Sequence, residues 1–194
     1  VILIAGSGPT DRDGNNPFMK NNSLRMMAVG LYENDIASLR FDKRGIAKST
    51  MPDFNESELR FEHYIEDVKL WIDMFKDDDR FSEIIILGHS EGSLIGMIAS
   101  QQIEVAKFVS IAGVGMQADD ILREQLKGQP TVYNLSVPIL DKLEKGELVD
   151  SVSPSLNVLF RKSVQPYLIS WFQYDPVDEI KKLNKPVLIV QGTT

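Results

Sequence analysis

The chain has 194 residues, enough for one domain with a sizeable core, and its 43% hydrophobic and 25% charged residues are ordinary for a globular protein. The formal net charge of −7 argues against nucleic acid as a partner, and no apolar run approaches the roughly 18 residues of a membrane span. Cysteine is absent, which excludes disulfides, thiolate metal sites and cysteine nucleophiles but does not fix the compartment.

Short apolar runs alternate with helix-length segments along the chain. The runs are rich in β-branched residues and read as strands at 1–5, 36–41, 83–88, 107–113 and 186–192. Helical periodicity is predicted for a segment capped by Ser23, for 60–76 and for 91–102. Because the strands are short and apolar on both faces, the alternation predicts a mostly parallel α/β sheet flanked by helices, with right-handed crossovers.

The alternation stops between Gly113 and Pro186. Helix-like pieces occur there at 117–127, 136–145 and 164–173, with no convincing strand. A stretch this long is not an ordinary connection, so it is interpreted as a helical cap insertion over the C-terminal edge of the sheet. The predicted organisation has three parts: the first part of an α/β core at 1–113, a helical cap at 114–175, and the continuation of the core at 176–194. Since the chain opens and closes at strands, it is expected to be the middle of a longer protein, so a signal peptide before it stays open.

A serine stands where one predicted strand ends and a helix begins. The sequence Gly88-His89-Ser90-Glu91-Gly92 fits the pattern G-x-S-x-G. In this pattern a sharp strand-to-helix turn lifts the serine hydroxyl clear of the sheet, and the glycines let strand and helix pass closely. The N–H groups that open the helix stabilise negative charge near the serine. Ser90 is therefore a candidate nucleophile; the alternative is a glycine-rich turn that happens to contain a serine.

The loop after the first strand, AGSGPTDRDGNN at 5–16, also carries polar residues. It lacks the Gly-Lys-Ser/Thr end of a phosphate-binding P-loop. A calcium loop starting at Asp11 fails, because Asn16 occupies the required glycine position and Asn22 that of the bidentate glutamate. Two interpretations remain: a plain turn, or an oxyanion loop whose backbone N–H points at a substrate oxygen.

These two motifs, with RFDKRGIAKS at 40–49 between them, resemble the α/β-hydrolase superfamily, and within it bacterial esterase-like serine hydrolases that carry GSGPxDRDG after the third strand. The resemblance extends over essentially the whole chain. It implies that Ser90 is the nucleophile and that the backbone amides of Ser7 and Glu91 form the oxyanion hole. The segment from Asp42 matches D-x-R-G-x-G-x-S, except that Ala47 replaces the second glycine; it is interpreted as structural.

A serine hydroxyl needs a base to take its proton, and the chain has two histidines. His89 is adjacent to Ser90 on the turn and is expected to pack beside the site. His63 lies near the polar side of its helix and is expected at the surface. The resemblance implies the order Ser, Asp, His, with the Asp directly after the last visible strand. Both partners are therefore expected beyond Thr194.

Three aspartates are alternatives for the acid. Asp175 precedes the last strand and is interpreted as a residue that starts a helix or hinges the cap. Asp119 and Asp120 follow the fourth strand and stay open as an unusual catalytic acid.

The expected reaction is cleavage of a small-molecule carboxylic ester through an acyl-enzyme, with no metal or organic cofactor. Most aromatic residues of the predicted cap are expected to pack, and some to line an acyl pocket. Two alternatives stay open. One is an aminopeptidase or amidase of the proline-iminopeptidase kind, in which Glu124, Glu144 or Glu147 holds a substrate amine. The other is a non-catalytic binding protein with the same fold. The oligomeric state is not indicated.

Overall fold

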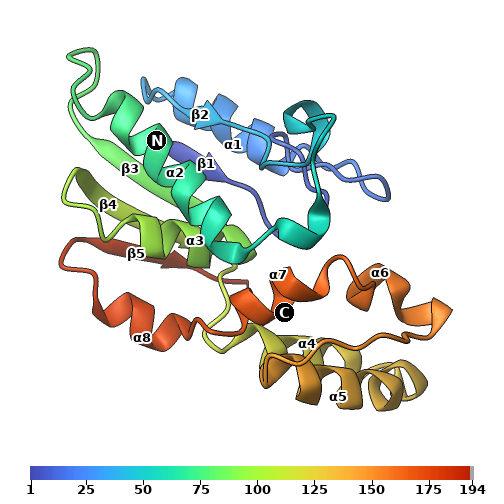
Figure 1. Ribbon diagram of the computed structural model, residues 1–194. Coiled ribbons are helices and arrows are strands. Elements are labelled where there is room, and N and C mark those ends of the chain that lie inside the picture. Colours follow the sequence, from blue (N-terminus) through green and yellow to red (C-terminus); the bar gives the residue numbers. More distant parts are fainter. Residues whose placement is uncertain (193–194) are drawn as a thin grey trace. The chain divides into compact units, whose positions relative to one another are not determined.

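The computed structural model describes residues 1–192, which form two compact units (Figure 1). The first unit contains Val1–Pro52, Tyr64–Val114 and the chain from Glu179 onward. The second contains Asp53–His63 and Gly115–Asp178. The segment 53–63, which the sequence analysis placed with the α/β core, thus groups with the helical part of the chain.

The first unit is built on a parallel sheet. Its strands are β1 (Ile2–Ile4), β2 (Leu39–Arg40), β3 (Ile84–His89), β4 (Val105–Ile111) and β5 (Val187–Val190). Among the described residues the sheet has five strands in the order β2-β1-β3-β4-β5, and every neighbouring pair is parallel. The predicted α/β class is confirmed, and each predicted strand is present with shifted ends.

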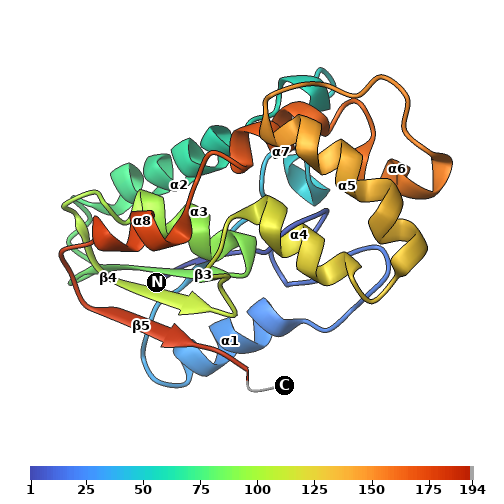
Figure 2. The ribbon, with the colours of Figure 1, turned by 90° about the horizontal axis from the view of Figure 1, so that it is seen from below.

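Helices cover both faces of this sheet. They are α1 (Ser23–Tyr32), α2 (Phe61–Phe75) and α3 (Glu91–Ala99). Figure 2 shows α1 on one face and α2 and α3 on the other. Side chains alternate along a strand, so Leu3 and Leu87 pack with Ala28 of α1, whereas Ile4 and Ile86 face Gly96 of α3.

Helix α1 does not begin as predicted. Ser23 is its first helical residue, and the N-cap is Asn22, whose backbone is left-handed with φ of 52° and whose side chain makes no cap hydrogen bond. Asn22 is instead held by Asn15, whose Oδ1 accepts from the Asn22 N–H at 2.9 Å. The loop before the helix therefore sets where it starts.

The strand order reverses next to β1. The chain passes from β1 to β2 on one side and then crosses to β3 on the other side. In open α/β sheets, ligands bind beyond the carboxyl ends of the strands at such a reversal. Ile4 is in register with Gly88, so the loop from Ala5 and the turn at Ser90 leave the sheet side by side.

The second unit is helical. It contains α4 (Ala118–Leu126), α5 (Pro130–Glu144), α6 (Asn157–Phe160), α7 (Gln165–Trp171) and the start of α8 (Pro176–Lys181). Short 3₁₀ turns occur in the chain at Ala47–Ser49, Glu56–Glu58 and Pro154–Leu156. Helix α5 begins six residues earlier than predicted, because Pro130 fits the first helical turn and the helix continues through Pro138. Within residues 1–192, no helix has the length and apolar character needed to cross a membrane.

Aromatic packing and one buried amide hold the second unit together. Phe61 stacks on Trp171 with ring centroids 5.9 Å apart, and Tyr167 and Tyr174 pack on the same ring at 6.2 and 5.2 Å. The fully buried Gln165 accepts from the Val149 N–H at 2.7 Å and donates to its carbonyl at 2.9 Å. The ring contacts of Phe61 explain why 53–63 groups with the helical segment.

Candidate active site

Ser90 sits on the turn between β3 and α3. Its φ of 53° and ψ of −121° lie in a region that L-residues rarely occupy and that costs of order 1–3 kcal/mol. The Ser90 N–H donates to the Ile111 carbonyl of β4 at 2.9 Å, and its own carbonyl accepts from the Ser93 N–H at 2.9 Å. The residue is half-buried. The turn therefore holds the serine in a strained conformation at the carboxyl edge of the sheet.

Two glycines make room for this turn. A Cβ at Gly92 would lie 2.5 Å from the Ala5 carbonyl oxygen and 2.6 Å from that of Ile4. A Cβ at Gly88 would lie 2.5 Å from Ser93 Cα. All these neighbours are backbone atoms of β1, its loop and α3, so no side-chain movement relieves the overlap. Helix α3 can approach β1 this closely only because Gly92 lacks a Cβ, and it can start this close to β3 only because Gly88 lacks one.

The first loop reaches the same point. A Cβ at Gly6 would lie 3.3 Å from Ser90 Cβ and 3.1 Å from His89 Nδ1. Ser7 follows on the exposed part of the loop, and within residues 1–192 its N–H donates to no protein acceptor. Glu91 is the first residue of α3, so its backbone N–H lies at the start of that helix, next to Ser90. Ser90, Ser7 and Glu91 thus gather where the strand order reverses.

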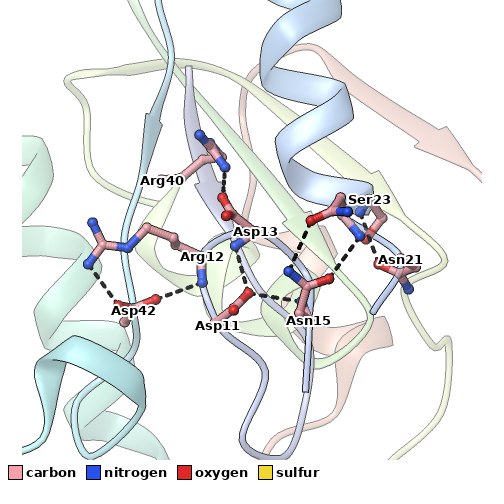
Figure 3. A network of polar contacts seen from close by, with 9 residues as sticks. Asp11, Arg12, Asp13, Asn15, Asn21, Ser23, Arg40 and Asp42 are labelled. Atoms are coloured by element: carbon pink, nitrogen blue, oxygen red, sulfur yellow. Dashed lines mark hydrogen bonds and ion pairs between the residues drawn. The ribbon is translucent and has the colours of Figure 1, made fainter. Parts of the chain in front are cut away.

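A polar network fixes the remainder of this loop (Figure 3). The Asp11 carboxylate accepts from the N–H groups of Asp13 and Asn15 at 2.8 and 2.9 Å, and Asp13 pairs with Arg40 at the end of β2. The Asp11 carboxylate is thus occupied by N–H groups of the loop itself, and the Asp13 carboxylate by Arg40 of β2. Among residues 1–192, no cluster of three or more histidine or acidic side chains could hold a metal ion.

Asp42 anchors the loop from the other side. Its carboxylate accepts from the Arg12 N–H and from the Arg12 guanidinium, both at 2.7 Å, and from the Lys48 N–H at 3.2 Å. Burial by itself raises the pKa of Asp42, but the hydrogen bonds from Arg12 and Lys48 outweigh it and hold the pKa below its usual value. The segment after β2 and the first loop are in this way one hydrogen-bonded structure.

A buried ion pair lies under the turn, and the sequence analysis did not anticipate it. Lys43 Nζ is 2.5 Å from Glu91 Oε2 and 2.8 Å from the Gly6 carbonyl oxygen, and each of the two charged side chains is 2% exposed. The signal for it was a lone carboxylate opening the otherwise apolar or small-residue helix 91–99. A buried carboxylate needs a cationic partner, and the basic run after β2 supplies it.

The histidines lie in different units. His89 is half-buried beside Gly6, and burial lowers its pKa below the usual value, which favours the neutral imidazole. His63 belongs to the second unit, and its Nδ1 accepts from the Arg60 N–H at 3.3 Å at the start of α2. This contact ties the His63 ring to the backbone three residues earlier.

The acidic alternatives all lie in the second unit. Asp119 is buried in α4, and burial, with the nearby Asp120 charge, raises its pKa. Asp175 accepts from the Val177 N–H at 2.8 Å and so begins α8, the helix-starting role that the sequence suggested.

The glutamates considered for amine binding lie on the surface of that unit. Glu124 pairs with Lys127 and Glu144 with Arg123, and both carboxylates are more than half exposed; Glu147 is exposed too. The aromatic residues Phe160, Tyr167 and Phe172 are buried in the unit's own packing.

Comparison with known proteins defines the family. Residues 22–155, more than half of the chain, match the hydrolase family described as serine aminopeptidase, S33. The chain belongs to this family. The S33 chain is also 27% identical over 197 residues to esterase EstD of Thermotoga maritima. That match covers 99% of this chain and 45% of EstD, so the chain spans less than half the length of this curated relative.

Solved structures share the fold of the S33 chain. Est1E from Butyrivibrio proteoclasticus, in a structure with ferulic acid bound, has a TM-score of 0.62 at 20% identity, over 98% of this chain and 67% of that one. The α/β hydrolase GrgF from Penicillium sp. sh18 has a TM-score of 0.56 at 16% identity, over 99% and 81%. The resemblance to the α/β-hydrolase superfamily is confirmed at the level of fold and family.

Proposed function

We propose that the protein is a serine hydrolase that cleaves carboxylic esters through an acyl-enzyme formed on Ser90. The single observation that carries the proposal is the backbone of Ser90, strained at φ 53° between β3 and α3 with Gly6 directly beside it. Folding alone does not require a serine in this conformation, and strained residues of this kind cluster at active sites.

In the proposed first step, Ser90 Oγ attacks the ester carbonyl carbon while its proton passes to a base. The carbonyl oxygen becomes an oxyanion that accepts hydrogen bonds from the Ser7 and Glu91 amides. When the carbonyl re-forms, the alcohol leaves with the proton and the acyl group stays on Ser90; water then repeats the sequence and releases the acid. In hydrolases that work through an acyl-enzyme, removing one hydrogen-bond donor of the oxyanion hole lowers kcat by about 10²–10³-fold.

The base and its orienting acid belong to the full-length protein in this proposal. Within residues 1–192, His89 makes no hydrogen bond to the Ser90 hydroxyl, and His63 belongs to the second unit. The resemblance orders the triad as Ser, Asp, His and places the last two after residue 194. Among the alternative acids, Asp119 is buried in α4, and burial raises its pKa.

Ester substrates are favoured by the relative that is named an esterase, which aligns over 99% of this chain. The family's description as serine aminopeptidase favours a second candidate, cleavage of aminoacyl amides. That candidate needs a carboxylate for the substrate amine, and Glu124 and Glu144 already pair with cations on their own surface. The ester is therefore the substrate class we propose.

A fluorophosphonate probe on the full-length protein tests the nucleophile. We expect covalent labelling at Ser90, and loss of labelling and about 10⁶-fold lower ester hydrolysis in Ser90→Ala. Ser82→Ala is the matched control, because this exposed serine precedes the opposite end of the same strand. Absence of labelling at every pH would support the non-catalytic binding protein instead.

A substrate panel separates the two reactions. p-Nitrophenyl esters with acyl groups of increasing length are compared with aminoacyl p-nitroanilides at equal enzyme concentration. We expect kcat/KM to be higher for the esters. Higher values for the anilides would replace the ester by the amide while leaving Ser90 as the nucleophile.

A further inference from the structure

Lys43 contacts the peptide unit that carries the Ser7 N–H and the side chain of Glu91, the two residues assigned to the oxyanion hole. Its ammonium is 2.8 Å from the Gly6 carbonyl oxygen and 2.5 Å from Glu91 Oε2. We infer that Lys43 is a positioning residue that aims the Ser7 and Glu91 amides at the same point, an inference that rests on the proposed function of Ser90. Lys43 itself does not touch the substrate in this arrangement.

The contact with Gly6 fixes the direction of the Ser7 N–H. The Gly6 carbonyl and the Ser7 N–H belong to one peptide unit, which is planar and trans. In such a unit the oxygen and the hydrogen point in opposite directions. Holding the oxygen toward Lys43 therefore turns the Ser7 N–H away from it, and hydrogen bonding at the oxygen polarises the unit and strengthens its N–H as a donor.

Within the loop, the nearest hydrogen bonds hold the following peptides: Thr10 Oγ1 donates to the Ser7 carbonyl and the Thr10 N–H to the Gly8 carbonyl, both at 2.8 Å. The Gly6 carbonyl accepts from Lys43 instead. Ser7 is flanked by Gly6 and Gly8, and Gly8 has a φ of 70° with no atom within 4 Å of the point that a Cβ would occupy. Ser7 is exposed, and the network around Asp11 begins only after Thr10. Without the hydrogen bond from Lys43 to the Gly6 carbonyl, rotation of the Gly6–Ser7 peptide would turn the Ser7 N–H away from the site.

The contact with Glu91 extends the same control to the second donor. Glu91 opens α3, so its carboxylate and its backbone N–H move together with the first turn of the helix. Lys43 in turn rests over the Tyr64 ring of α2, 4.7 Å from the ring centroid. One ammonium thus connects the loop after β1, the start of α3 and a rigid helix.

Stability alone does not account for a charged pair here. Replacing a buried ion pair by apolar residues of similar size is often neutral or stabilising, so a buried pair is weak grounds for a role in stability. The presence of this pair is better explained by the hydrogen bond from Lys43 to the Gly6 carbonyl, which fixes the Gly6–Ser7 peptide.

The test uses the full-length protein and the double variant Lys43→Met/Glu91→Leu, which leaves no unpaired buried charge. The first readout is the Ser7 amide nitrogen resonance, which responds to hydrogen bonding at the carbonyl oxygen of its own peptide unit. The second is the kinetics of p-nitrophenyl ester hydrolysis. The matched control is Lys185→Met, because Lys185 also donates to two backbone carbonyls, Gln102 and Val105, at 2.7 and 2.6 Å, but near the start of β4.

We expect the double variant to move the Ser7 resonance and to lower kcat about 10–100-fold, less than outright loss of a donor, with KM changed less than about threefold. Lys185→Met should change neither. In Glu91→Gln, which keeps Lys43 and its contact with Gly6, the Ser7 resonance should stay near its wild-type position. This split separates positioning from general loss of structure.

An unchanged Ser7 resonance in the double variant overturns the inference, whether or not the protein hydrolyses esters. A changed resonance with unchanged kcat overturns it too, because the peptide then moves without consequence for catalysis. If the wild-type protein neither labels at Ser90 nor cleaves any ester while the resonance moves, the grip of Lys43 on the peptide is supported and the proposed function is what fails.

Discussion

Two lysine–glutamate pairs in the first unit test how burial sets the strength of an ion pair. Lys43–Glu91 and Lys107–Glu83 both have an N···O separation of 2.5 Å. The side chains of the first pair are 2% exposed, whereas those of the second are 47% and 37% exposed. We predict that the two pairs, identical in residue type and distance, respond very differently to removal of one partner.

The magnitudes follow from the solvent around each charge. Lys43→Met leaves the Glu91 carboxylate buried without its cation, and breaking a buried pair in this way costs about 3–5 kcal/mol. Lys43→Met/Glu91→Leu removes both charges and should recover most of that loss. Lys107→Met leaves a carboxylate that water can solvate, so it should cost at most about 1 kcal/mol, and its double variant with Glu83→Leu should differ little.

Urea unfolding of the full-length protein and the six variants, the four single and two double substitutions, gives the coupling energy of each pair by a double-mutant cycle. We expect a coupling energy of several kcal/mol for Lys43–Glu91 and below about 1 kcal/mol for Lys107–Glu83. Loss of less than about 1 kcal/mol in Lys43→Met would refute the reasoning, because the two charges would then be hydrated in solution. A coupling equal for both pairs would refute it as well.

Three further changes have predictable directions. Ala47 has a φ of 46° and is exposed, so Ala47→Gly should raise the unfolding free energy by about 1 kcal/mol and Tm by about 2–4 °C in a thermal scan; a lower Tm would contradict the strain argument. Gly92→Ala places a Cβ 2.5 Å from the Ala5 carbonyl oxygen and should destabilise by about 1–3 kcal/mol in urea, whereas Gly30→Ala, with no atom within 4 Å, should not. The lowered pKa of Asp42 gives stability that is present above the unfolded pKa of about 3.9 and is lost as pH falls through the lower folded value. Asp42→Asn should therefore flatten the acid limb of a stability–pH curve below about pH 4. An unchanged acid limb would contradict the hydrogen bonds assigned to that carboxylate.

Local patterns were sufficient to predict the sheet and the place of the serine turn. The apolar runs at 83–88 and 107–113 correspond to β3 and β4, and the pattern G-x-S-x-G coincides with the junction of β3 and α3. Both signals depend on neighbouring residues only: side-chain period along a strand, and steric demand at one turn. That is why the existence of these two strands was predictable, whereas their ends differ from the predicted ones by one or two residues.

Contacts between distant segments were not predictable in the same way. The grouping of 53–63 with the helical unit depends on the Phe61 ring packing against residues more than 100 positions later. The Lys43–Glu91 pair joins positions 48 apart, and nothing in either local sequence specifies the partner. Ala47 illustrates a third limit. Its backbone is left-handed, as glycine would allow without strain, but an alanine in the sequence gives no sign of that conformation.

The strained backbone of Ser90 yields one more prediction, because it lowers the stability of the protein while it places the proposed nucleophile. Ser90 is held at φ 53° by the Ile111 carbonyl on one side and the first turn of α3 on the other. Ser90→Gly removes the Cβ that makes this conformation unfavourable, whereas Ser90→Ala keeps it. Both variants lose the hydroxyl, so hydrolysis should be lost equally, but only the glycine variant should gain stability, by about 1 kcal/mol in urea unfolding. Equal stability of the two variants would mean that the turn is relaxed in solution, and the main structural reason for assigning the nucleophile to Ser90 would fall with it.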